Sequence, residues 1–522
     1  MKEKTKIKLN DRLQKIPNTV KAAFISCFIS GFVAHLFAFT NIIPNPDGIS
    51  RVYDLQQMTV SGRWFLHYAS AWNGYVQAPA LIGFFSVLFV AIAASFAVCV
   101  LEIKKPVFAA FIGALMIVFP SVSFTFLFMF TASAYCFAIM LAVISVWLTK
   151  KYKSGFLAGS VLLACATGTY QAYISVGASL ALIALILFVL DKDRKIKDIL
   201  LLALRFIALL AMGLLLYAVI LKIFLFAKDL TLIDYRGISS MGSASWFKDT
   251  ILKIPSAYRK FLSYYFKVNG FAKYTTLFSV VINIAFLVLG LYSMIMNIIL
   301  NKRHKAPEAI ICLIVLLVFV PLAFNLTVLM GDASPIMRYS LVFSYIIVLA
   351  LTDRTDKQIP QIALGAASIL ILIVSMQIGN LAYTAYATEH RAAESFATRL
   401  VERIETTPGY RSDMEVVIIG GFPKNVYHNE IEEFELIADP VAASVIPNTK
   451  HVYYYLNDWL NVTWKMPDES IMMEVSDSEE FKAMPLYPSD GSVVISGDRV
   501  IVRLSEAYTP KAAFEIQYEN RR

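Results

Sequence analysis

The chain has 522 residues, of which 58% are hydrophobic and only 16% charged, whereas soluble domains are about 45–50% apolar and about 25% charged. One soluble core cannot bury this much apolar material, because single cores stop growing at roughly 250–300 residues. The composition excludes a soluble enzyme, a disordered tail and a disulfide scaffold, and leaves a polytopic membrane protein. The net charge of +9 alone would suggest nucleic acid, but basic residues on membrane loops act as topology signals, so we expect no nucleic-acid partner.

The charge is divided unevenly along the chain. Residues 383–522 carry 13 basic and 23 acidic residues, whereas residues 1–382 carry 34 basic and 15 acidic residues. We therefore predict three parts: a basic cytoplasmic tail at 1–21, a transmembrane domain at 22–382 that contacts the lipid bilayer, and a separate acidic domain at 383–522. The five cysteines all lie in apolar runs, and their spacing matches neither a disulfide framework nor a metal site.

Eleven apolar runs are candidate transmembrane helices, since a helix needs about 20 apolar residues to cross a bilayer. In chain order they are Ala22–Ile42, Pro79–Leu101, Val107–Phe119, Phe126–Leu148, Gly155–Ala166, Ala172–Leu190, Ile199–Ala227, Thr275–Leu300, Ala309–Leu329, Tyr339–Thr352 and Ile362–Leu381. The third, fifth and tenth are short, so we expect them to need a thinned or protein-lined surrounding.

The loops between these runs predict the topology. The N-terminal tail and alternate loops carry the basic residues, which places them in the cytoplasm; these loops are 102–105, 150–153, 191–197, 301–305 and 353–357. Eleven spans then put the acidic domain outside the membrane. The remaining loops, which hold most of the polar residues, must be extracytoplasmic: Ile43–Ala78, Pro120–Thr125, Thr167–Gln171, Lys228–Tyr274 and Met330–Arg338.

The first outer loop gathers candidate catalytic residues: Asp47, Asp54, Arg63, Trp64 and His67. A carboxylate just outside the first span could act as a general base toward an acceptor hydroxyl. A nearby arginine could hold a lipid-linked phosphate through paired charge-assisted bonds. The alternative is a solvated loop with a structural ion pair between one of the two aspartates and the arginine.

The long outer loop is basic and includes Arg236. From Trp246 to Phe266 its apolar residues recur at near-helical spacing, which predicts one or two amphipathic helices in the membrane interface. This surface could attract an anionic lipid carrier, or it could be a plain interfacial anchor.

Two outer tips hold further candidates. Tyr170 and Gln171 could hydrogen-bond a sugar, or they could form a satisfied helix–turn–helix tip. Arg338 begins a span, where a charge is costly unless it is paired, so it is a candidate site residue. Its alternative role is an ion pair with Asp332, which could itself contact sugar.

The acidic domain reads as a small α/β domain. A helix is predicted over Glu389–Thr406, and the strand-like runs are Glu415–Ile419, His451–Leu456, Ser470–Val475, Ser492–Ile495 and Arg499–Leu504, the last two forming a hairpin. Since this part shows no catalytic motif, we expect it to bind or shape an acceptor.

The order of these features resembles the Gtr type II family of bacterial membrane glucosyltransferases and, more widely, glycosyltransferases with a GT-C architecture. The resemblance rests on Asp47 followed by Ser61–Trp64, on Tyr170–Tyr173 and, less specifically, on the arginine tip at Arg338. It implies an α-helical polytopic, GT-C-like fold of about 11 transmembrane helices followed by an extracytoplasmic α/β domain. It also implies a polyprenyl-phosphate-linked glucose, or a related sugar, as donor, and a surface polysaccharide outside the bacterial cytoplasmic membrane as acceptor.

We therefore expect an integral-membrane glycosyltransferase. Asp47, or alternatively Asp54, would be the base, while Arg63, Arg338 and Arg236 would hold donor phosphate. Sugar contacts would come from His67, Trp64, Tyr170, Gln171 and Asp332. No motif supplies a clear metal cage. The alternatives are a lipid-linked sugar flippase or transporter, which would need ionisable residues at mid-depth of the bilayer, and a surface-polysaccharide polymerase or ligase.

Overall fold

The computed structural model describes residues 16–49, 59–192, 194–230, 232, 244–268, 276–330, 334–423 and 445–509. The chain divides into two compact units. The membrane unit comprises residues 1–42 and 53–382, and the tail unit comprises residues 43–52 and 383–522.

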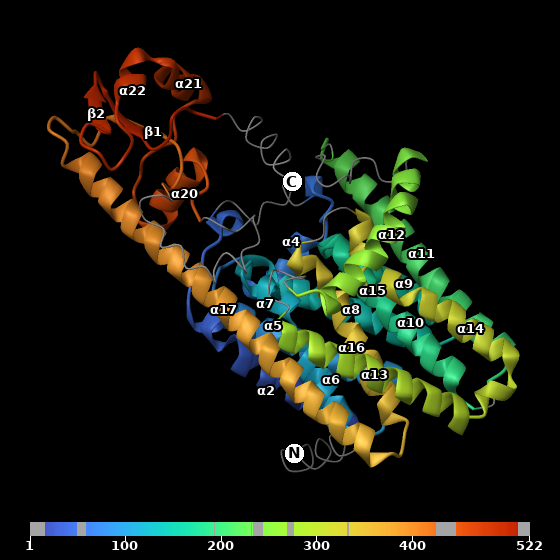
Figure 1. Cartoon of the computed structure of the whole chain (residues 1–522). Coiled ribbons are helices and arrows are strands. Elements are labelled where there is room, and N and C mark those ends of the chain that lie inside the picture. Colours follow the sequence, from blue (N-terminus) through green and yellow to red (C-terminus); the bar gives the residue numbers. More distant parts are fainter. Residues whose placement is uncertain are drawn as a thin grey trace, which may run out of the picture. The chain divides into compact units, whose positions relative to one another are not determined.

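The membrane unit is a helical bundle, with its helices labelled in Figure 1. Among the described residues, ten helical stretches are long and apolar enough to cross a membrane, and α9 (Gly155–Thr169) is a shorter apolar helix. The ten are α2 (Asn18–Thr40), α5 (Pro79–Leu101), α6 (Pro106–Val118) with α7 (Pro120–Phe126), α8 (Met129–Lys151), η3 (Gln171–Tyr173) with α10 (Ile174–Leu190), α11 (Ile196–Ala227), α13 (Leu277–Leu300), α14 (Pro307–Val318) with α15 (Val320–Phe324), η6 (Pro335–Val342) with α16 (Phe343–Asp353), and α17 (Gln358–Glu405). This confirms the prediction of a polytopic helical membrane protein.

Four short elements and the 23-residue helix α12 are also described in this unit. They are α4 (Leu66–Ala69), η2 (Ser70–Asn73), α12 (Ala244–Phe266), η4 (Arg303–Lys305) and η5 (Leu326–Met330). The predicted amphipathic helix is α12, and its position in the membrane interface stays a prediction. Asn325 Nδ2 donates to the Ala257 carbonyl oxygen at 3.1 Å. The Tyr265 hydroxyl donates to the Leu341 carbonyl oxygen at 2.8 Å. One face of α12 is therefore packed on the bundle.

Two of the short predicted spans are longer in the structure, because they continue through a break. At the end of α6, Phe119 leaves the helical conformation (φ −54°, ψ 137°), and Pro120 then starts α7. Proline suits a first helical position, where its missing N–H costs nothing. Together α6 and α7 span 21 residues. The tenth span likewise gains length from η6, which precedes α16.

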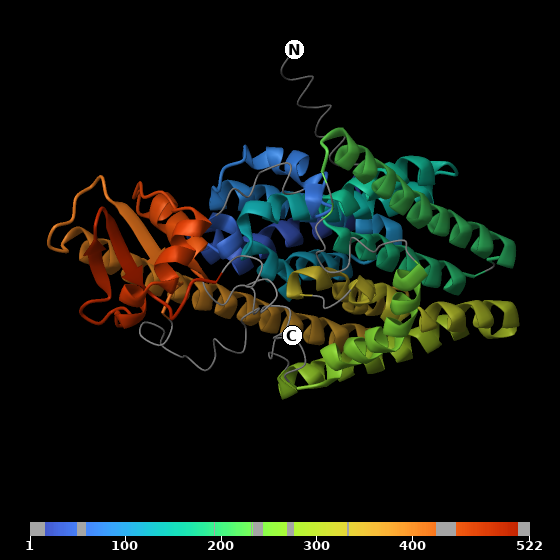
Figure 2. The same cartoon turned by 90° about the horizontal axis from the view of Figure 1, so that it is seen from above.

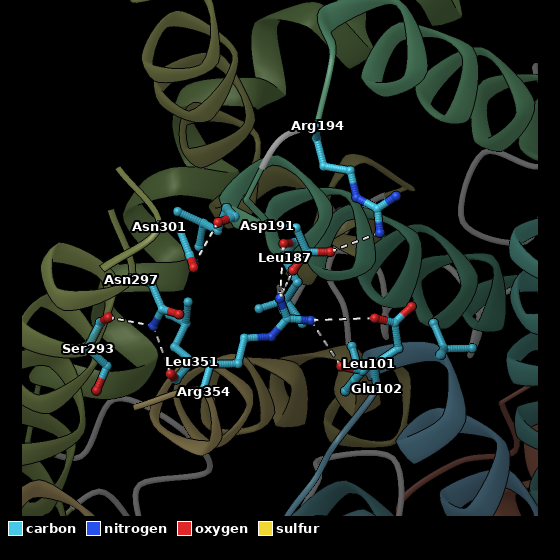
Figure 3. Close-up of polar contacts among 12 residues, drawn as sticks. Leu101, Glu102, Leu187, Asp191, Arg194, Ser293, Asn297, Asn301, Leu351 and Arg354 are labelled. Carbon is cyan, nitrogen blue, oxygen red and sulfur yellow. Dashed lines mark hydrogen bonds and ion pairs between the residues drawn. The ribbon is translucent and has the colours of Figure 1, made fainter. Parts of the chain in front are cut away.

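One end of the membrane unit, which we call the basic end, joins the five basic loops (Figure 3). Arg354 Nη1 lies 2.5 Å from Asp191 Oδ1, and its other terminal nitrogen lies 4.0 Å from Glu102 Oε2. Lys150 Nζ lies 2.7 Å from Glu102 Oε1. Asn301 Nδ2 donates to the Leu190 carbonyl oxygen at 2.9 Å. These contacts tie together the ends of α5, α8, α10, α13 and α16.

The described part of the tail unit contains a three-stranded sheet in the order β1-β3-β2. Its strands are the orange and red arrows in Figure 2. Strand β1 (Glu415–Ile419) runs parallel to β3 (Arg499–Arg503), and β2 (Val493–Ser496) runs antiparallel to β3 as the predicted hairpin. Among the residues described between β1 and the hairpin, three helices are present: α20 (Thr449–Trp459), α21 (Glu469–Asp477) and α22 (Glu479–Ala483). The predicted α/β domain is confirmed.

Two of the predicted strands were wrong. Residues 451–456 lie in α20 and residues 470–475 lie in α21. The first run is rich in aromatic residues, which favours strands, but Asn448 caps it by accepting the backbone N–H of His451. In α21 the buried residues are Met472, Val475 and Ser476, and this spacing fits a helical face better than alternation.

A segment of the first outer loop belongs to the tail unit. Residues 43–52 group with residues 383–522 and include the 3-10 helix η1 (Pro46–Ile49). Ile49 is fully packed in the core formed by Phe396, Val416 and Tyr453, among others. The chain therefore leaves the membrane unit after α2, contributes to the tail unit, and returns before Thr59.

Candidate functional site

The first outer loop re-enters the membrane unit through a tight turn at Gly62. This glycine has φ +79°, in the left-handed region that favours glycine. Its backbone N–H donates to the Thr59 carbonyl oxygen at 2.8 Å. A Cβ atom at this position would lie only 2.5 Å from Gln171 Nε2 and 2.9 Å from the Tyr217 hydroxyl. The turn therefore needs glycine both for its backbone conformation and for the close approach of these side chains.

Two buried side chains, Gln171 and Tyr217, form hydrogen bonds with the backbone of this turn. Gln171 Nε2 donates to the Ser61 carbonyl oxygen at 3.0 Å and lies 3.3 Å from the Tyr217 hydroxyl. The Tyr217 hydroxyl donates to the Gly62 carbonyl oxygen at 3.1 Å. The sequence reasoning missed Tyr217, because a single tyrosine within the apolar run of α11 carries no pattern. Gln171 is thus engaged by the protein, and its predicted sugar contact stays a prediction.

Arg63 follows this turn and lies over an aromatic pair. Its guanidinium carbon is 4.9 Å from the centroid of the Tyr170 ring. Tyr135 stacks on Tyr170, with centroids 4.7 Å apart and an interplanar angle of 12°. Cation–π contacts of this kind hold a guanidinium by its face. The planar fork of N–H groups then presents the geometry that matches phosphate oxygens.

Trp64 and His67 take different positions around this turn. Trp64 is buried and packs against Gly168, where an added Cβ would lie 2.5 Å from the indole, and it stacks on Phe224 at 5.9 Å. Its indole N–H has no hydrogen-bond partner among the described residues. His67 is half-buried and stacks on Tyr75, with centroids 4.8 Å apart. The sugar contacts predicted for both residues stay predictions.

Arg338 lies in η6, on a second tip of the membrane unit. Its backbone (φ −100°, ψ 23°) interrupts the helical path there. Its positive charge acts on Tyr264 of α12. Burial raises the pKa of Tyr264 well above its ordinary value, as do Tyr345 and Tyr265, while Arg338 lowers it. The second predicted phosphate-binding arginine therefore lies in a tyrosine-rich surrounding.

The tips predicted from the sequence come together at one end of the membrane unit. The backbone N–H of Phe65 donates to the Gly168 carbonyl oxygen at 2.8 Å, which joins the first loop to the end of α9. Ser121 Oγ donates to the Pro335 carbonyl oxygen at 2.7 Å, which joins α7 to η6. Element η3 also packs against η6. We call residues 61–65, 168–173, 120–121 and 335–342 the tip cluster.

Of the remaining predicted residues, Asp47 is described, as part of the tail unit. Asp47 is exposed on η1 of the tail unit, in a turn where Asn45 Oδ1 accepts the backbone N–H of Gly48 at 3.0 Å. Asp54, Arg236 and Asp332 lie outside the described residues. Within the described ranges, no three His, Cys, Asp or Glu side chains converge to hold a metal ion.

Comparison with known proteins points to one family. A family model described as Glucosyl transferase GtrII matches residues 36–351, which include the C-terminal end of α2, the tip cluster and most of the membrane unit. No curated protein and no solved structure matches the chain.

Proposed function

The chain belongs to the GtrII glucosyl transferase family and is a glycosyltransferase, and from this premise we propose that it moves glucose from a polyprenyl-phosphate donor to a surface polysaccharide. The proposal rests on the cation–π contact of Arg63 in the tip cluster, where the guanidinium carbon lies 4.9 Å from the centroid of the Tyr170 ring. A phosphate bound by this arginine would place the donor sugar beside the outer tips. The bundle would have the GT-C architecture that the sequence resembles.

The proposed reaction is a single displacement at the anomeric carbon. An acceptor hydroxyl oxygen attacks this carbon, and the bond from the carbon to the donor phosphate oxygen breaks. The lipid phosphate leaves with the bonding electron pair, and Arg63 and Arg338 stabilise its added negative charge. The hydroxyl proton passes to a carboxylate, which we assign to Asp47 with Asp54 as the alternative. One displacement inverts the configuration of the sugar.

The proposal includes an orientation. The basic end carries the lysines and arginines of five loops, and this bias favours the cytoplasmic side. The tip cluster and the tail unit would then act outside the bacterial cytoplasmic membrane, where a surface polysaccharide is available. The tail unit would bind or shape this acceptor.

The basic end argues against the alternative of a flippase or transporter. Alternating access requires one group of helices to rock against another around a midplane site. Here Arg354 alone contacts Asp191, Glu102 and the Leu187 carbonyl oxygen, which joins the ends of α5, α10 and α16. Opening this end would break the largely buried contact between Arg354 and Asp191, which are 10% and 23% exposed, and such a charge pair is costly to separate. A polymerase or ligase is distinguished by its acceptor and product.

The test compares the surface polysaccharide of cells that lack the protein with that of cells carrying wild type or Asp47→Asn. We expect wild type to add glucose and Asp47→Asn to reduce the addition by about 10²–10⁴-fold, the usual contribution of a general base. Asp413→Asn, an exposed aspartate of the tail unit, is the matched control and should keep wild-type activity. Membrane levels of all variants are compared by immunoblot.

Each outcome has a distinct meaning. If wild type adds no glucose, the proposed donor and acceptor are overturned. If Asp47→Asn is fully active, Asp47 is removed from the mechanism, and Asp54→Asn then decides the identity of the base.

A further inference from the structure

The membrane unit contains a half-open cavity of about 40 Å³ between α12, α13, α16 and α17. Its lining includes Tyr264, Ser279, Asn283, Tyr345 and Ser375. A single water needs roughly 10–15 Å³ by the same measure, so the space suits about three waters or one branched unit of five carbons. None of the sugar- or phosphate-binding residues predicted from the sequence lines this cavity.

The helices that line the cavity are apolar and exposed on their outer faces. On α13, Phe278 and Val281 are close to Ser279 in sequence and are 52% and 57% exposed. On α17, Ile373 lies two residues from Ser375 and is 47% exposed. Successive residues of a helix are about 100° apart around its axis, so these three side chains point away from the cavity. In a membrane-spanning unit they meet lipid, and the cavity lies behind this lipid-facing surface.

The polar groups of the cavity wall are engaged by the protein itself. The Tyr345 hydroxyl donates to Asn283 Oδ1 at 2.8 Å, and Asn283 Nδ2 donates to the Tyr265 carbonyl oxygen at 2.9 Å. Ser279 Oγ lies 3.1 Å from Thr276 Oγ1. Since these groups already have partners, the wall does not demand a polar ligand. The apolar part of the lining comes from α17 and from the junction of α6 and α7: Ile371, Val374, Ile378, Phe119 and Pro120.

The cavity also borders the predicted phosphate site. Tyr264 lines the cavity, and the hydroxyl of the adjacent Tyr265 donates to the Leu341 carbonyl oxygen of η6, the element that bears Arg338, at 2.8 Å. An apolar cavity next to a cationic side chain fits a ligand whose hydrocarbon begins directly at a phosphate. A polyprenyl phosphate has this chemistry, with a methyl branch on each five-carbon unit. A bilayer phospholipid differs, because its glycerol separates the acyl chains from the phosphate.

We infer that this cavity receives the phosphate-proximal isoprene of the lipid-linked donor and thereby sets the enzyme's preference for a polyprenyl carrier. The inference rests on the proposed function, since it assigns a place to the carrier of the proposed donor. Ser375 then acts as a specificity-determining residue, because its small side chain leaves room for the branched chain.

The experiment fills the cavity and compares two donors. Wild type, Ser375→Trp and Ile373→Trp are purified at full length and reconstituted in nanodiscs. The acceptor is surface polysaccharide from cells that lack the protein. The donors are undecaprenyl phosphate-glucose and ethyl phosphate-glucose, which has no isoprene. We expect Ser375→Trp to lower kcat/KM at least tenfold for the undecaprenyl donor and less than twofold for the ethyl donor. Ile373→Trp, on the exposed face of the same helix, should change neither.

Other outcomes overturn the inference. An unchanged kcat/KM for the undecaprenyl donor, or an equal loss with both donors, would mean that the cavity does not receive the carrier and that any lipid in it is an ordinary acyl chain. If Ser375→Trp does not fold, Ser375→Leu is measured with the same two donors, and the same two outcomes support or overturn the inference. Failure of wild type to use the undecaprenyl donor would instead overturn the proposed function, and the inference with it.

Discussion

The guanidinium of Arg63 lies over the ring of Tyr170, 4.9 Å from its centroid. We expect this contact to orient the arginine for the donor phosphate. Such contacts contribute about 0.5–2 kcal/mol, depending on desolvation. Tyr170→Leu should therefore lower kcat/KM for the donor about 3- to 30-fold. Tyr170→Phe keeps the aromatic face and should stay within twofold of wild type. Equal kcat/KM values for the two variants would show that the cation–π contact between Arg63 and the aromatic ring does not contribute to donor binding.

Gly62 offers a test of the turn that precedes Arg63. Gly62→Ala would place a methyl 2.5 Å from Gln171 Nε2 in a backbone with φ +79°. We expect a loss of about 2–5 kcal/mol, from roughly 1–2 kcal/mol of left-handed strain and two weakened hydrogen bonds of about 0.5–1.5 kcal/mol each. Thermal unfolding in detergent and transfer activity would measure it.

The matched control for this variant is Gly74→Ala. Gly74 also has a positive φ, +65°, but nothing lies within 4 Å of an added Cβ. It should show the strain alone, about 1–2 kcal/mol. If both variants lose the same stability and activity, the clamp formed by Gln171 and Tyr217 has no special role.

Arg354 tests the role of the basic end. Its side chain is 10% exposed and contacts Asp191 and Glu102. Arg354→Ala would leave Asp191, which is 23% exposed, with the longer contact to Arg194, while Glu102 would keep Lys150. Breaking a buried pair costs about 3–5 kcal/mol, which is the upper limit for this partly buried one. We expect a large drop in the unfolding temperature, with unchanged transfer activity per folded molecule. Arg194→Ala removes a more exposed partner of Asp191, 42% exposed, and should cost less than about 1 kcal/mol.

The tail unit should lose stability in acid through His451. Burial, and to a lesser extent Lys450, lowers the pKa of His451 to about 4 from an ordinary value of 6.5. The unfolded chain therefore binds a proton below pH 6.5 while the folded chain stays neutral. The stabilisation is complete above pH 6.5 and is lost as the pH falls toward 4, on the order of 3 kcal/mol in total.

This acid sensitivity is measured by following unfolding of the full chain between pH 4 and 7 by tryptophan fluorescence. His451→Gln should flatten the slope of stability against pH in this range. His304→Gln, at the exposed η4 of the basic end, should leave the slope as in wild type. An unchanged slope in His451→Gln would exclude this histidine as the cause.

Much of the membrane unit could be predicted from the sequence, because span length and loop charge are local properties. The run Pro79–Leu101 was predicted with the bounds that α5 has. The tail was harder: the aromatic run 451–456 has strand propensity, yet Asn448 starts a helix there. Nor could Tyr217 be found, since its role depends on a hydrogen bond to Gly62, 155 positions away.

The placement of residues 43–52 in the tail unit makes that unit discontinuous. Cutting the chain after Ala382 would not yield two intact halves, because Ile49 would stay with the first half while its packing partners left with the second. Nor could the tail be grafted onto another transferase as a simple C-terminal fusion. A chimera that keeps both units intact must therefore exchange residues 43–52 together with residues 383–522.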